Sequence, residues 1–201
     1  MEISAPAIVC ATRPHGETAV IARLLTADYG IVAGYVAGGR GRVLRPVLIP
    51  GNLVAAELRA RSDSQLPFAR LELIESRGPW LGEPLAAAAL GWLTALTATA
   101  LPERQPFPAL YEALSGALTA ICHAPSARGW LPALTGYEAL VLRELGYGGA
   151  AARRLAGDWA AALAQFDALG PPLERYLLAD RRGDVMAARA MLRERLARIG
   201  D

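Results

Sequence analysis

Short apolar segments separated by turn residues fill the chain up to residue 75. The clearest of them, residues 52–61, alternates between an apolar side and a side that holds Glu57, Arg59 and Arg61. An alternation with period two is typical of a strand that has one buried and one solvated face. Five such segments joined by turns predict a small β-barrel, and they cover residues 3–12, 18–27, 31–36, 52–61 and 68–74.

The apolar spacing changes to three and four residues after residues 76–79. This spacing predicts helices, with a short additional piece near 172–179; the helices cover residues 84–101, 107–123, 127–147, 150–167 and 184–199. We therefore expect an α+β protein in which an all-β domain, residues 1–79, precedes an all-α domain, residues 80–201.

Two helical segments carry further information. No charged residue lies between Glu83 and Glu103, but this stretch is rich in alanine and threonine and contains Pro84 and Pro102, so we expect a core helix and not a membrane span. The last helix has an apolar stripe, and its arginines lie off that stripe, which predicts a solvated face for Arg189, Arg193 and Arg195.

The basic residues are unusual in kind and in distribution. The chain has no lysine, so all 21 basic residues are arginine, and the net charge is only +2. Residues 36–61 contain five arginines against one glutamate, a local charge of +4, whereas residues 80–149 contain three arginines against five glutamates, a local charge of −2. Three of the arginines, Arg40, Arg42 and Arg45, lie in a glycine-rich connection between two predicted strands. Arginine matches phosphate oxygens, so this loop favours nucleic-acid binding; a solvated hairpin loop is the alternative.

The residues that usually carry catalysis are few. The two cysteines, Cys10 and Cys122, lie among apolar residues without a CxxC spacing, and we expect buried free thiols. The two histidines, His15 and His123, show no metal-binding spacing, and a hydrolase that uses Cys122 and His123 is a remote alternative. The sequence therefore predicts a protein that is not an enzyme and that holds no metal or cofactor.

Several motifs, taken in order, resemble the bacterial DNA repair protein family RecO. They are Gly16-Glu17 to Thr26, Tyr29-Gly30, Gly38-Gly39-Arg40-Gly41-Arg42, and the helical segment Tyr137-Glu138-Ala139-Leu140 to Arg143-Glu144-Leu145-Gly146-Tyr147-Gly148. The similarity spans residues 1–148 and resumes loosely near 173–178 and 187–196. In many family members a four-cysteine zinc module follows this helical segment. Here no cysteine follows Gly148, so metal binding is not carried over.

The resemblance implies an OB-fold joined to a helical domain and a cytoplasmic, nucleoid-associated protein of DNA repair and recombination. It implies binding of single- and double-stranded DNA, annealing of complementary strands, and help in loading the recombinase RecA onto DNA coated with single-stranded DNA-binding protein. It also implies partnership with RecR and with the C-terminal tail of single-stranded DNA-binding protein. By position, DNA contact maps to the basic loop and barrel face, which hold Arg40, Arg42, Arg45, Arg59 and Arg61.

Three further expectations remain open. Tyr29, Tyr35 and Phe68 are possible stacking platforms for bases, although we expect each of them to fill the barrel. For an acidic tail peptide, the candidate cations of the helical domain are Arg128, Arg143 and Arg153. The alternative function is a non-enzymatic protein–protein interaction module that does not bind nucleic acid.

Overall fold

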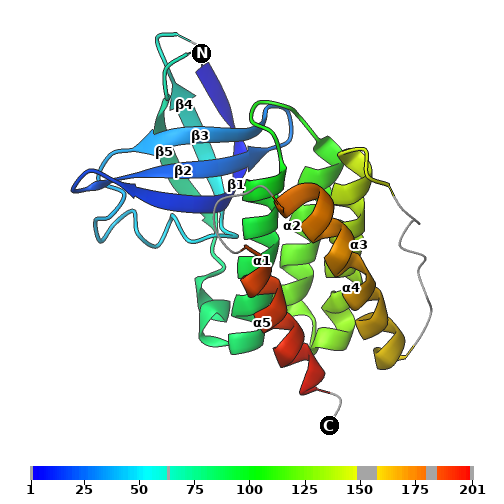
Figure 1. The fold of residues 1–201 in the computed structure, drawn as a ribbon. Helices are drawn as coiled ribbons and strands as arrows, with labels where there is room; N and C mark the ends of the chain where they lie inside the picture. Colours follow the sequence, from blue (N-terminus) through cyan, green and yellow to red (C-terminus); the bar gives the residue numbers. More distant parts are fainter. Residues whose placement is uncertain (1, 63, 149–157, 180–184, 200–201) are drawn as a thin grey trace. The chain divides into compact units, whose positions relative to one another are not determined.

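A computed structural model describes residues 2–62, 64–148, 158–179 and 185–199 (Figure 1). Its internal contacts divide the chain into two compact units, which we treat separately. The first unit comprises Met1–Gly82 together with Leu101–Tyr111, and the second comprises Glu83–Ala100 together with Glu112–Asp201.

Five strands of the described residues close into a barrel in the order β1-β2-β3-β5-β4. The barrel and its five strands confirm the sequence prediction, and the strand order is that of an OB-fold. All neighbouring strands are antiparallel except β3 and β5. The strands are β1 (Glu2–His15), β2 (Ala19–Thr26), β3 (Gly30–Val36), β4 (Leu53–Arg59) and β5 (Phe68–Glu75).

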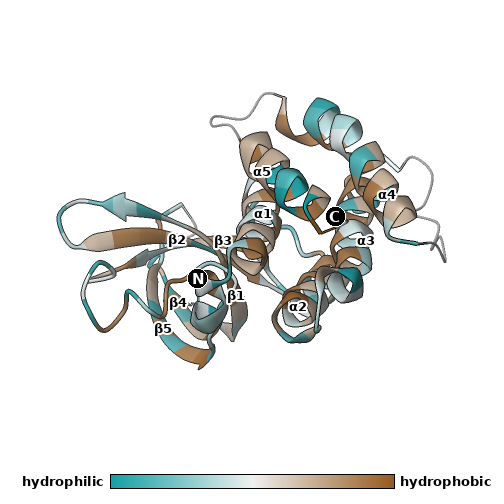
Figure 2. Ribbon diagram, turned by 90° about the horizontal axis from the view of Figure 1, so that it is seen from below, coloured by the Kyte–Doolittle hydropathy of each residue, from teal (hydrophilic) through white to brown (hydrophobic). Residues whose placement is uncertain are grey.

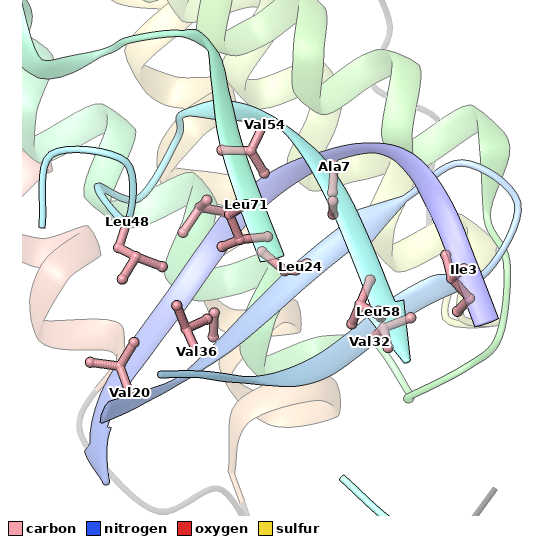
Figure 3. Close-up of a cluster of buried hydrophobic side chains, with 13 residues drawn as sticks. Ile3, Ala7, Val20, Leu24, Val32, Val36, Leu48, Val54, Leu58 and Leu71 are labelled. Atoms are coloured by element: carbon pink, nitrogen blue, oxygen red, sulfur yellow. The ribbon is translucent and has the colours of Figure 1, made fainter. Parts of the chain in front are cut away.

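The interior of the barrel is filled by aliphatic side chains from every strand (Figure 3). Strand β4 illustrates how the sequence builds it, because Val54 and Leu58 are fully buried while Glu57 and Arg59 between and beyond them are exposed. The alternating pattern of residues 52–61 thus marks the two faces correctly. Leu48, from the connection between β3 and β4, joins the same core.

The barrel closes where β3 meets β5. The backbone amide of Tyr35 donates a hydrogen bond of 2.8 Å to the Pro67 carbonyl, and Tyr35 is in register with Phe68. Gly34 allows this approach, since a Cβ atom there would lie 2.7 Å from Cβ of Ala69. A residue with a side chain at position 34 would therefore push the two strands apart.

The segment 101–111 packs on the barrel, although it lies in the range expected for the helical domain. The amide of Arg104 donates to the Ile31 carbonyl (2.8 Å), and the Arg23 guanidinium contacts the Glu103 carboxylate (2.7 Å). Gly30 has a φ of +67°, and a Cβ atom at this position would lie only 1.9 Å from the Gln105 carbonyl oxygen. Two features therefore require glycine at position 30: its positive φ, and the backbone of Gln105, which leaves no room for a Cβ atom.

The second unit is helical, and most of its helices carry both hydrophobic and hydrophilic residues (Figure 2). Its helices are α1 (Pro84–Ala100), α2 (Pro108–His123, whose first turn belongs to the first unit), α3 (Ala127–Glu144), α4 (Trp159–Leu173), the π-helical turn η2 (Glu174–Leu178) and α5 (Val185–Ala197). A short 3₁₀ helix, η1 (Gly78–Gly82), ends the first stretch of the barrel unit.

One helix differs clearly from its predicted range. The start of the helix expected at residues 150–167 lies largely outside the described residues, and the observed α4 begins at Trp159. The predicted end at residue 167 is wrong, because the helix continues through Pro171 and Pro172 into η2. The two prolines remove successive amide donors, and the helix passes into π-helical geometry directly after them. The sequence also places Asp184 to cap the start of the last helix, but this residue is not among the described residues.

Helix α1 lies in the core of the second unit. Trp92, Leu93 and Leu96 are fully buried, and the hydroxyls of Thr97 and Tyr137 share a hydrogen bond of 2.6 Å. In the described part of the chain, no helix combines the length and the apolar character that a bilayer span requires.

A buried ion pair connects three helices of this unit. The Glu138 carboxylate of α3 accepts two hydrogen bonds from Arg189 of α5 (2.9 and 2.8 Å) and one from the indole Nε1 of Trp92 (2.7 Å). The Arg189 guanidinium also lies 3.8 Å from the ring centroid of Phe166. The solvated face expected for Arg189 is therefore wrong, since only 5% of this residue is exposed. Burial raises the pKa of the Glu138 carboxyl, and the hydrogen bonds and charge of Arg189 offset part of that rise.

Candidate nucleic-acid interface

The connection between β3 and β4, residues 37–52, is held to the barrel by buried contacts. Asn52 is fully buried, and its side-chain amide donates to the carbonyls of Pro46 (2.8 Å) and Val47 (3.0 Å). Its amide oxygen accepts from the backbone of Arg77 (2.7 Å). Gly39 lies so close to the core that a Cβ atom there would be 2.5 Å from Val20. These contacts define the backbone that carries the three loop arginines.

The loop arginines are exposed. The backbone amide of Arg40 donates to the Thr18 carbonyl (3.0 Å), and its guanidinium donates to the Glu17 carbonyl (2.9 Å). The backbone amide of Arg45 donates to the Gly41 carbonyl (3.0 Å), which closes a turn around Arg42. Over the described residues, none of these three side chains pairs with a carboxylate. Their charges are therefore available to an anion.

The other two candidate arginines lie at the end of β4. Arg59 forms an ion pair with Glu2 (3.1 Å), but both side chains are about 70% exposed, so the pair contributes little to stability. Arg61 is exposed, two residues further along the chain. An open pocket forms here; it is lined by Glu2, Arg59, Ala60, Arg61, Gln65, Leu66 and Phe68. The structure thus brings Arg59 and Arg61 to one pocket, apart from the arginine loop.

Aromatic side chains lie on the outer face of the barrel. The rings of Tyr35 and Phe68 contact each other edge to face, with centroids 5.2 Å apart, and the ring of His15 meets Tyr35 in the same manner at 5.8 Å. Phe68 is 66% exposed and Tyr29 is 42% exposed. The expectation that these residues fill the barrel is therefore wrong. The sequence contained a signal for Phe68, since it has the same parity along β5 as Arg70 and Glu72.

The second unit carries a different exposed aromatic pair. The rings of Tyr147 and Tyr176 stack with centroids 5.1 Å apart, both residues are nearly half exposed, and Arg175 lies 5.4 Å from the Tyr176 ring. Of the cations expected to hold an acidic peptide, Arg128 lies over the ring of Trp159 (5.0 Å), Arg143 pairs with Glu144 (3.0 Å), and Arg153 is outside the described residues.

The thiols are buried and free, as the sequence predicts. Burial raises the pKa of Cys10 to about 12, so its thiol keeps its proton at neutral pH. A search of the described residues finds no group of three or more His, Cys, Asp and Glu side chains arranged to hold a metal ion.

Comparison with known proteins agrees with this architecture. The family model described as recombination protein O N terminal matches residues 1–77, and the model for recombination protein O C terminal matches residues 81–156. The chain belongs to the RecO family. This confirms the resemblance found in the sequence.

Curated RecO relatives give the extent of the similarity. The DNA repair protein RecO of Phenylobacterium zucineum (strain HLK1) is 43% identical over 152 residues, which cover 74% of this chain and 60% of that protein. The DNA repair protein RecO of Rhodospirillum centenum (strain ATCC 51521 / SW) is 44% identical over 149 residues, which cover 74% of this chain and 58% of that protein. The matched region thus spans about 60% of the length of these RecO relatives.

Proposed function

We propose that the protein is a DNA repair and recombination mediator whose barrel unit binds single- and double-stranded DNA. The observation that carries this proposal is the group of three exposed arginines, Arg40, Arg42 and Arg45, on a loop held by buried contacts and without carboxylate partners in the described structure. Arg59 and Arg61 add a second basic group on the same barrel. The known role of the RecO relatives in DNA repair, as their names state it, agrees with this proposal.

The chemistry of the proposed interface is phosphate neutralisation. Guanidinium groups on the loop displace counterions from the DNA backbone, and this favours binding without reading the base sequence. Annealing of two complementary strands is opposed by the repulsion between their phosphates. A protein that neutralises phosphates lowers that repulsion, so the proposed interface would promote strand annealing. Help in loading the recombinase RecA is part of the proposal because the chain belongs to the RecO family.

The first prediction concerns the loop arginines. In the variant R40A/R42A/R45A we expect weaker binding to all DNA sequences, because three phosphate contacts are lost. The salt dependence of binding, measured by fluorescence anisotropy, should decrease by about 2–3 in the slope of log K against log salt concentration.

The matched control is R70A/R143A/R193A, which removes the same positive charge from exposed or partly exposed arginines that already pair with carboxylates. We expect the control to bind DNA nearly as tightly as the parent. If the loop variant bound DNA as tightly as the parent at low salt, the proposed interface would be wrong.

The same proposal extends to protein partners. A C-terminal tail of single-stranded DNA-binding protein is acidic and ends in an apolar residue, and the exposed Tyr147–Tyr176 pair with Arg175 offers both an apolar contact and a cation. Titration of a labelled tail peptide should give saturable binding that Y176A weakens. RecR is the second expected partner, to be tested by sedimentation of the mixture.

The alternative, a protein–protein interaction module on a barrel scaffold, predicts a different outcome. Such a module would show no salt-sensitive binding to oligonucleotides. An anisotropy titration with a mixed-sequence single strand at two salt concentrations separates the two functions.

A further inference from the structure

His15, Tyr35 and Phe68 form a row of rings across β1, β3 and β5, which we call the aromatic strip. The register across the barrel runs from Arg13 through Ile21, Tyr35 and Phe68 to Arg59. Paired residues of adjacent strands point to the same face, and none of these five belongs to the cluster that fills the barrel, although Ile21 is itself buried (8% exposed). The aromatic strip therefore lies on the outer surface, with an arginine in register at either end.

Phe68 is much more exposed than its neighbour Tyr35, which is half-buried. The exposed fraction of Phe68 is 66%, and Leu66, in the same pocket, is 41% exposed. A large apolar side chain at a strand position that faces solvent loses the free energy that burial would give it. The edge-to-face contact with Tyr35 restrains the ring while it leaves much of its surface open.

The charges near the strip favour an anionic partner. Arg59 and Arg61 line the pocket that contains Phe68. At the other end, Arg40 donates hydrogen bonds to the carbonyls of residues 17 and 18, which lie in the turn directly after His15. Carboxylates also lie near these arginines: Glu2 already pairs with Arg59, Glu17 is the residue whose carbonyl Arg40 contacts, and Glu57 lies on the same face of β4 two residues before Arg59.

We propose that the aromatic strip stacks the bases of single-stranded DNA, with Phe68 as the principal platform, while Arg40, Arg59 and Arg61 hold the adjacent phosphates. This inference rests on the proposed function, and it adds that the outer face of the barrel prefers single-stranded to double-stranded DNA. Bases in a duplex are stacked on each other, so a ring on an open surface distinguishes single strands from duplexes. Every base has a π face, so the contact is tolerant of sequence.

The test compares two proteins and two oligonucleotides. The parent and F68A are titrated with a single strand that carries its normal bases and with the same strand in which the bases are replaced by abasic sites. We expect F68A to bind the normal strand about 5- to 160-fold more weakly than the parent. We expect the two proteins to bind the abasic strand equally, because stacking is absent there and the phosphate contacts are retained.

Three controls make the result specific. L81A removes an exposed aliphatic side chain from η1, which does not line the pocket of Phe68, and should bind nearly as the parent does. F68Y keeps the ring and should restore binding. A duplex of the same length should bind to F68A and to the parent with similar affinity, and thermal unfolding followed by circular dichroism should show that F68A is folded.

Three outcomes would overturn the aromatic strip as a base platform. The first is equal affinity of the parent for normal and abasic strands. The second is an equal loss of affinity for single strands and duplexes in F68A. The third is a sedimentation result in which the parent is a dimer and F68A is a monomer. This result would mean that the strip binds a second copy of the chain. In the first two cases the parent still binds DNA in a salt-sensitive way, so the proposed function stands; absence of any such binding removes both proposals.

Discussion

The carboxylate of Glu138 has only donors around it, the Nε1 group of Trp92 and two guanidinium nitrogens of Arg189. A buried carboxylate that loses its cation must either stay charged without compensation or take up a proton, and removal of one partner of a buried ion pair typically lowers the free energy of unfolding by about 3–5 kcal/mol. We therefore expect R189M to destabilise the second unit by such an amount. The measurement is the free energy of unfolding in urea.

A second substitution makes this prediction specific to the charge. E138Q in the R189M background removes the buried charge, while its amide oxygen can still accept from Trp92. We expect R189M/E138Q to be more stable than R189M alone. Strictly additive losses in the double-mutant cycle would show that the two residues do not act as a pair.

The thiol of Cys10 gives a prediction for pH. Its pKa is about 12 in the folded protein against 9.0 for the unperturbed group, so unfolding releases a proton once the pH exceeds 9. The contribution of the buried, protonated thiol to the free energy of unfolding is fully present below pH 9 and is lost as the pH rises toward 12. We expect the free energy of unfolding of the parent to fall by up to about 1.4 kcal/mol more per pH unit above 9 than that of C10A. Urea unfolding at pH 8, 9 and 10 measures this, and identical pH dependences would contradict it.

At the scale of elements, Asn52 connects the arginine loop to the rest of the barrel. In N52A, the carbonyls of Pro46 and Val47 and the amide of Arg77 lose their partner. The hydrogen bond to the Arg77 amide is buried and the two to the Pro46 and Val47 carbonyls are part-buried, so we expect a loss of about 1–3 kcal/mol in the free energy of unfolding. Hydrogen exchange of the amides of residues 40–48 should become faster, and DNA binding should weaken at unchanged net charge. Unchanged exchange in this loop would mean that other contacts fix it.

The elements show how far a sequence can be interpreted. Alternation and helical spacing depend on neighbours in the chain, so the five strands and the face of β4 that holds Arg59 were predictable. The partner of Glu138 was not predictable, because Arg189 lies 51 residues away in the chain. The position of Glu138 in the apolar stripe of α3 did indicate that this carboxylate would be buried and would need a partner. The aromatic strip depends on the closure between β3 and β5, which local pattern does not specify. The apolar spacing also gave the wrong end for the fourth helix, since α4 runs past residue 167 to Leu173 and contains Pro171 and Pro172.

At the scale of the whole molecule, the contacts that carry the proposed DNA interface and the buried ion pair belong to different units. The arginine loop is held by Asn52 and by residues 17 and 18 of the first unit, whereas Glu138, Arg189, Trp92 and Phe166 all belong to the second. Substitutions that share no contacts are usually additive within about 0.3–0.5 kcal/mol. The two units should therefore be separable by mutation.

This separation leads to a last prediction. R189M should lower the stability of the second unit but leave the affinity for a single strand and its salt dependence as in the parent, measured at a temperature where both proteins are folded. R40A/R42A/R45A should show the reverse, a lower salt dependence with unchanged urea unfolding of the helices. The variant that combines all four substitutions should show both effects at their single-variant sizes, since neither set of contacts includes a residue of the other. A loss of DNA affinity in R189M comparable with that of the loop variant would mean that the helical unit contributes directly to the interface, and the assignment of DNA binding to the barrel unit would have to be revised.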